Sequence, residues 1–143
     1  MVIGRSPAGT LVTCSTHVPL TAGGALGCSE GAGVDEEARM TKRASDLVTE
    51  AKAQVEALDP SSVERELQSG DAVLVDLREP AELAEHGRIP GSVHVPRGML
   101  EFRADLTSSY HQEPLDPSKR VILHCASGGR SALGAATLRP APP

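Results

Sequence analysis

The pattern of apolar and polar positions changes near residue 40. Before it, glycine recurs among Ala, Ser and Thr without a helical or strand period, so residues 1–40 are expected to form a disordered tail. After it, apolar side chains recur at helical spacing over residues 47–58. This spacing predicts a helix that gives way to a short strand near residues 54–58. The folded domain is therefore expected to cover residues 41–143.

Three short apolar runs predict the strands of a sheet. They cover residues 72–76, 93–95 and 120–124. The first and third runs are almost unbroken, which is typical of strands that are buried on both faces of a parallel sheet.

Helices are predicted between and after these runs. They cover residues 60–69, 80–86, 99–106 and 131–138. Asp59 and Pro60 form a typical start for the first helix, and Gly70 and Gly87 are expected to end the first and second. The alternation of strands and helices predicts an α/β domain with a parallel sheet.

Composition narrows the class of protein. The chain has one Phe, one Tyr and no Trp, so its core is expected to consist of Val, Leu, Ile and Ala. A nucleic-acid surface that works by base stacking is not expected. The formal net charge of −5 argues against a duplex nucleic acid or an anionic membrane as partner. No apolar run approaches the roughly 18 residues that a membrane-spanning helix needs.

The three cysteines, Cys14, Cys28 and Cys125, are odd in number and widely spaced. This usage indicates a reducing compartment rather than a disulfide framework.

The N-terminal segment is too polar for a signal peptide, so a cytoplasmic location is expected. Cys14, His17 and Cys28 leave a zinc site open as an alternative, although a fourth ligand is missing nearby.

One short segment combines the residue types that anion-binding chemistry needs. It lies between a predicted strand and a predicted helix and reads Cys125-Ala126-Ser127-Gly128-Gly129-Arg130-Ser131. Its small residues let successive backbone N–H groups turn inward, and the helix adds the positive end of its dipole. A thiol at the rim of such a cradle is expected to ionise readily. The alternative is a buried, inert cysteine followed by a turn that only connects two elements.

This segment resembles the active-site loop of the rhodanese family, in which a cysteine is followed by two variable residues, glycine, one further residue and arginine. Two other segments resemble family motifs in the same order. They read Val75-Asp76-Leu77-Arg78-Glu79 and Arg88-Ile89-Pro90-Gly91-Ser92-Val93-His94-Val95-Pro96. The resemblance covers residues 55–138. It implies a rhodanese-like three-layer α/β fold with a parallel sheet flanked by helices.

The resemblance implies a sulfurtransferase. Cys125 would take the outer sulfur of thiosulfate or of a persulfide, hold it as a cysteine persulfide, and pass it to cyanide or to a thiol, including one on a protein acceptor. Residues 126–130 would bind the anionic sulfur through their backbone N–H groups. Asp76 and Arg78 are expected to brace neighbouring loops, and Arg78 is a weaker candidate for substrate contact. No metal, organic cofactor, nucleic acid or membrane is implied.

Two alternatives stay open. Cysteine phosphatases and arsenate reductases have a related fold and a similar His-Cys start, but they place five residues between cysteine and arginine. Four residues lie between Cys125 and Arg130, and the shorter loop favours sulfur chemistry.

Family members also continue past the active-site helix with another strand and helix, which the segment after Leu138 does not resemble. The domain is therefore expected to be C-terminally truncated, which leaves a non-catalytic interaction module as the other alternative.

Overall fold

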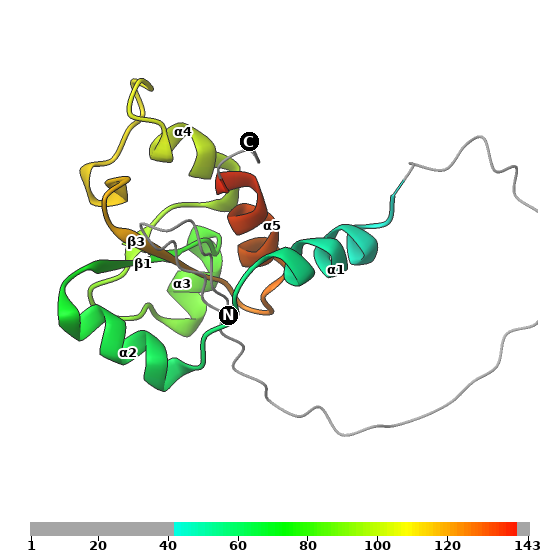
Figure 1. The fold of residues 1–143 in the computed structure, drawn as a ribbon, viewed down its shortest axis with the longest axis horizontal. Helices are drawn as coiled ribbons and strands as arrows, with labels where there is room; N and C mark the ends of the chain where they lie inside the picture. The colour runs from blue at the N-terminus through cyan, green and yellow to red at the C-terminus, as the bar shows by residue number, and fades with distance from the viewer. Residues whose placement is uncertain (1–41, 140–143) are drawn as a thin grey trace, which may run out of the picture.

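Strands and helices alternate along residues 42–139, the part of the chain that the computed structural model describes (Figure 1). The elements are α1 (Ala44–Gln54), α2 (Pro60–Ser69), β1 (Ala72–Asp76), α3 (Pro80–His86), β2 (Val93–His94), α4 (Leu100–Ala104), β3 (Arg120–His124) and α5 (Gly129–Leu138). A short 3-10 helix, η2 (Arg97–Met99), precedes α4, and another, η3 (Glu113–Leu115), precedes β3. The predicted disordered tail, residues 1–40, lies outside the described residues.

The strands form one parallel sheet in the order β2-β1-β3. Because the strands are parallel, their C-terminal ends meet at one edge of the sheet. At that edge, Asp76 of the central strand β1 aligns with His94 of β2 and with His124 of β3. The predicted α/β fold with a parallel sheet is confirmed, and this edge is where such sheets bind ligands.

Helices cover both faces of the sheet. Successive side chains of a strand point to opposite faces, so the sheet can pack against helices on both sides. Leu74 and Ile122 point to one face, where they pack with Val63 of α2. Leu123 points to the other face and belongs to the cluster that includes Ala132 of α5. Helix α1 packs against α5 on that side (Figure 1). The result is the expected three-layer arrangement of helices, sheet and helices.

The core of the described domain is aliphatic, as the composition predicts. Its largest fully buried side chains are leucine, isoleucine and valine. The two aromatic side chains lie at the surface, where Phe102 is 55% and Tyr110 61% exposed. They contact each other edge to face, with ring centroids 6.4 Å apart. The aromatic pair therefore adds little to the packing around the sheet.

Most predicted helices and strands are confirmed, but the strand expected near residues 54–58 is wrong. Helix α1 continues to Gln54, and only Glu56 makes a single bridge. The helix expected over residues 99–106 is also shorter, since α4 ends at Ala104. There, the side chain of Asp105 accepts a hydrogen bond of 2.8 Å from the backbone N–H of Thr107, which stabilises a turn in place of another helical residue.

Helix α5 begins at Gly129, two residues before the predicted start at Ser131. The helix can begin there because Gly128, its N-cap, adopts a φ of 86° and closes the preceding loop. None of the helices within residues 42–139 combines the length and the apolar character that a bilayer crossing requires.

Candidate active site

Cys125, the predicted nucleophile, directly follows β3 at the C-terminal edge of the sheet. Its side chain is fully buried, and the chain then turns sharply into α5. Gly128 permits this turn, because its φ of 86° lies in the left-handed region that glycine adopts without strain. Ala126 and Ser127 are exposed and form the outer rim of the loop.

Backbone groups of the loop and of α5 converge on the Cys125 sulfur. The N–H groups of Gly128 and Ser131 donate to Sγ over 3.1 and 3.4 Å. The thiol in turn lies 3.4 Å from the Ser131 hydroxyl, which donates to the Gly128 carbonyl. Ser131 stands in the first turn of α5, where the helix dipole is positive. Both the N–H groups and the dipole favour negative charge on the sulfur.

Arg130 is held by a carboxylate from another helix. Its Nη1 lies 2.6 Å from Glu82 Oε2, and its Nη2 lies 2.7 Å from Glu82 Oε1. Glu82 also accepts a hydrogen bond of 2.8 Å from the backbone N–H of Glu79, as part of the capping box that begins α3. Hydrogen bonds from Arg130 and then from Glu79 lower the pKa of Glu82 to about 2. The ionised pair therefore ties the active-site loop to α3.

Asp76 and Arg78 form a second ion pair, at the end of β1. Arg78 Nη2 lies 2.7 Å from Asp76 Oδ2 and also donates to the Gly87 carbonyl over 2.9 Å. Burial raises the pKa of Asp76, but the hydrogen bonds from Arg78 outweigh it and hold the pKa below its usual value. Arg78 is only 8% exposed, so it offers little surface to a substrate. The pair joins the end of β1 to the end of α3.

Two histidines lie beside this pair. His94 Nε2 is 2.8 Å from the Arg78 carbonyl oxygen, which fixes the loop that follows β1. His124 directly precedes Cys125 and is half-buried. Burial lowers the pKa of His124, while the charge of Asp76 opposes the shift. His124 is therefore neutral at neutral pH and adds no positive charge next to the sulfur.

The sequence predicted no role for two residues of this arrangement, Ser131, which closes the singled-out segment, and Glu82. The signal for Ser131 is its place in the first turn of the helix after Arg130. The signal for Glu82 is its position three residues after Glu79 at a helix start, which predicts a capping box. That local signal gives no indication that Glu82 also binds Arg130.

The zinc alternative cannot be placed in this structure, because Cys14, His17 and Cys28 lie outside the described residues. Among residues 42–139, no group of three or more His, Cys, Asp and Glu side chains is arranged to hold a metal ion.

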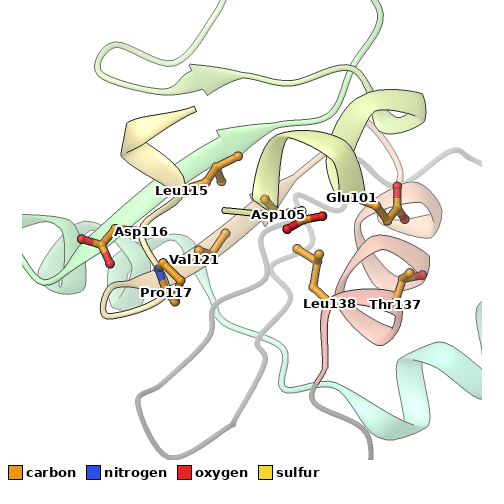
Figure 2. A pocket seen from close by; sticks show the side chains of 9 residues that line it. Glu101, Asp105, Leu115, Asp116, Pro117, Val121, Thr137 and Leu138 are labelled. Atoms are coloured by element: carbon orange, nitrogen blue, oxygen red, sulfur yellow. The ribbon is translucent and has the colours of Figure 1, made fainter. Parts of the chain in front are cut away.

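A pocket of about 390 Å³ lies at the other end of β3 from Cys125 (Figure 2). Its lining includes the apolar side chains of Val121, near the start of β3, and Leu138, at the end of α5, together with the carboxylates of Glu101 and Asp105. Because β3 runs from this pocket towards the loop, the pocket is separate from the sulfur site.

Two curated proteins that are named as sulfurtransferases are similar in sequence to this chain. A thiosulfate sulfurtransferase/rhodanese-like domain-containing protein 3 from Mus musculus is 33% identical over 70 residues, which are 46% of this chain and 45% of that protein. A sulfurtransferase from Allochromatium vinosum is 31% identical over 78 residues, which are 54% of this chain and 64% of that protein. The matches thus span less than two thirds of the length of these relatives.

A solved structure and a family model also match this chain. The structure is that of a protein of unknown function from Rhodopseudomonas palustris, described as a possible tyrosine phosphatase, with a TM-score of 0.62 and 35% identity. The match covers 73% of this chain and 80% of that one. The model of the rhodanese-like domain matches residues 59–141, which include the whole cysteine loop and make up more than half of the chain. This chain therefore belongs to the rhodanese-like domain family.

Proposed function

We propose that this domain is a sulfurtransferase that carries sulfur as a persulfide on Cys125. The observation that carries the proposal is the environment of Sγ, which accepts hydrogen bonds from the N–H groups of Gly128 and Ser131 at the C-terminal edge of a parallel sheet. These N–H groups stabilise the Cys125 thiolate, both as the attacking group and as the leaving group. Membership of the rhodanese-like family and the sulfurtransferase names of the relatives support the same assignment.

In the first half-reaction, the Cys125 thiolate attacks the outer sulfur of the donor. With thiosulfate, a bond forms between Sγ and the outer sulfur, the sulfur–sulfur bond of thiosulfate breaks, and sulfite leaves with the bonding electron pair. The terminal sulfur of the new persulfide carries the negative charge. In the second half-reaction, cyanide or a thiolate bonds to that terminal sulfur, and Cys125 leaves as a thiolate. Each half-reaction conserves charge, and neither needs an external oxidant or reductant.

The Ser131 hydroxyl suits both half-reactions. It accepts from the thiol and donates to the Gly128 carbonyl, and its proton can rotate towards the sulfur once the thiolate forms. The loop thereby adapts to a neutral or an anionic sulfur by rotation of one hydroxyl group.

Phosphoryl transfer is the competing activity, because the matched Rhodopseudomonas palustris protein is described as a possible tyrosine phosphatase. Two features favour sulfur transfer. Only four residues separate Cys125 from Arg130, which makes a smaller cradle than a tetrahedral phosphate group needs. The guanidinium of Arg130 is also bound by Glu82 on both nitrogens, so it is not presented as a clamp for phosphate oxygens.

Steady-state transfer of sulfur from thiosulfate to cyanide tests the proposal. The wild-type domain should show ping-pong kinetics, and Cys125→Ser should lower kcat/KM by about a thousandfold or more because the covalent intermediate is lost. A Cys14→Ser/Cys28→Ser double variant is the matched control and should keep its activity. Full transfer by Cys125→Ser would remove the mechanism. Hydrolysis of para-nitrophenyl phosphate that depends on Cys125, without sulfur transfer, would assign a phosphatase, and neither activity in the folded domain would favour an interaction module.

A further inference from the structure

Both arginines beside the active-site loop are paired with carboxylates. Arg78 binds Asp76, and Arg130 binds Glu82 through two parallel hydrogen bonds. Each pair is neutral as a whole, so neither guanidinium brings a net charge to the loop. Among the described residues, the backbone N–H groups of the loop and the N-terminus of α5 then attract an anion.

The pair of Arg130 and Glu82 differs from the other one in its exposure. The side chains of Arg130 and Glu82 are 32% and 30% exposed, whereas those of Arg78 and Asp76 are 10% and 0% exposed. A pair at the surface can reorganise without leaving a buried charge unpaired. Arg130 also directly precedes Ser131, whose N–H and hydroxyl contact the sulfur. The direction of the guanidinium is therefore set by Glu82 rather than by packing in the core.

We propose that Glu82 is a positioning residue that keeps Arg130 turned away from the incoming donor and so tunes the loop for donors of low charge. The inference rests on the proposed sulfurtransferase function and names its substrate class, a singly charged persulfide in preference to the dianion thiosulfate. An unpaired guanidinium would attract a dianion twice as strongly as a monoanion, because Coulomb energy scales with charge. Its neutralisation by Glu82 therefore penalises thiosulfate more than a persulfide.

A charge-neutral substitution tests this role. Glu82→Gln should lower the KM for thiosulfate about two- to fivefold, with a smaller change for a small alkyl persulfide and little change in kcat. The matched control is Glu85→Gln, which removes the same charge from the same helix at an exposed position whose nearest partner is His86 at 3.7 Å. Glu85→Gln should leave both KM values unchanged. An unchanged ratio of the two KM values in Glu82→Gln would overturn the proposal.

Two further variants separate charge from structure. Arg130→Gln leaves the Glu82 carboxylate unpaired and should raise the KM for thiosulfate relative to the persulfide. The double variant Glu82→Gln/Arg130→Gln has lost both charges and should return the ratio to its wild-type value. The other charged groups that act on the pair, Arg78, Glu79 and Cys125, are unchanged in all these variants. A double variant that keeps the ratio of Glu82→Gln would also overturn the proposal.

Alkylation of Cys125 gives a measurement that needs no sulfur transfer. In a Cys14→Ser/Cys28→Ser background, the rate with anionic iodoacetate divided by the rate with neutral iodoacetamide reports how the loop attracts an anion, because the thiolate fraction cancels. This ratio should rise about 1.4- to 2.2-fold in Glu82→Gln, the square root of the change expected for the dianion thiosulfate, and stay constant in Glu85→Gln. A rise without persulfide formation from any donor would reject the proposed function but keep the positioning role. If the domain transfers sulfur but Glu82→Gln changes neither the KM ratio of the two donors nor the alkylation ratio, the proposed function stands and the positioning role is rejected.

Discussion

Gly128 is the residue on whose backbone conformation the sulfur site depends most. Its φ of 86° directs its own N–H towards Sγ at 3.1 Å and allows α5 to begin at the next residue. A side chain at this position would meet the steric cost that L-residues have in the left-handed region. The same residue therefore shapes the loop and supplies one of the hydrogen bonds to the sulfur.

Gly128→Ala should lower both stability and sulfur transfer. The strain is about 1–2 kcal/mol in the free energy of unfolding, and any relaxation of φ turns the N–H away from Sγ. The matched control is Gly70→Ala at the end of α2, where φ is 83° and no atom lies near the added Cβ. This control should lose similar stability in urea unfolding and keep its kcat/KM. Equal turnover in the two variants would contradict the role given to the Gly128 N–H group.

Helix α5 packs closely against the rest of the domain at Gly134, which has no side chain. A Cβ built on Gly134 would lie 2.7 Å from Leu100 Cδ2 and 3.3 Å from atoms of Leu77 and Leu123. All three leucines are fully buried, so any shift of their methyl groups has to be absorbed within a packed core. This close approach sets the height of α5 above the sheet and hence the position of its N-terminus at the sulfur.

Gly134→Ala should therefore destabilise the domain, although alanine is the better helix former. Overpacking of this kind costs about 1–3 kcal/mol, which is a large part of the stability of a small domain. Thermal or urea unfolding measures the loss. Gly98→Ala is the control, since no atom lies near its added Cβ and its φ is not positive. A Gly134→Ala variant as stable as Gly98→Ala would show that α5 packs less tightly than described.

At the scale of the whole molecule, the sequence predicts elements better than contacts between them. Strands such as β1 and β3 are predictable because their apolar runs are local, and α2 is predictable because Asp59 caps its start and Gly70 its end. The pairing of Arg130 with Glu82 spans 48 residues, and no local pattern indicates it. Likewise, the composition of the loop predicts an anion cradle, but not that Ser131 supplies an N–H group and a hydroxyl to the sulfur.

The central claim, that Cys125 carries transferable sulfur, is tested most directly by the mass of the intact protein after treatment with thiosulfate. One added sulfur, a gain of about 32 Da, should appear in the wild-type protein, map to the peptide that contains Cys125, and disappear when cyanide is added with release of thiocyanate. Cys125→Ser should show no gain. A gain of the same mass that persists in Cys125→Ser, or a gain at Cys125 that cyanide does not remove, would contradict the account.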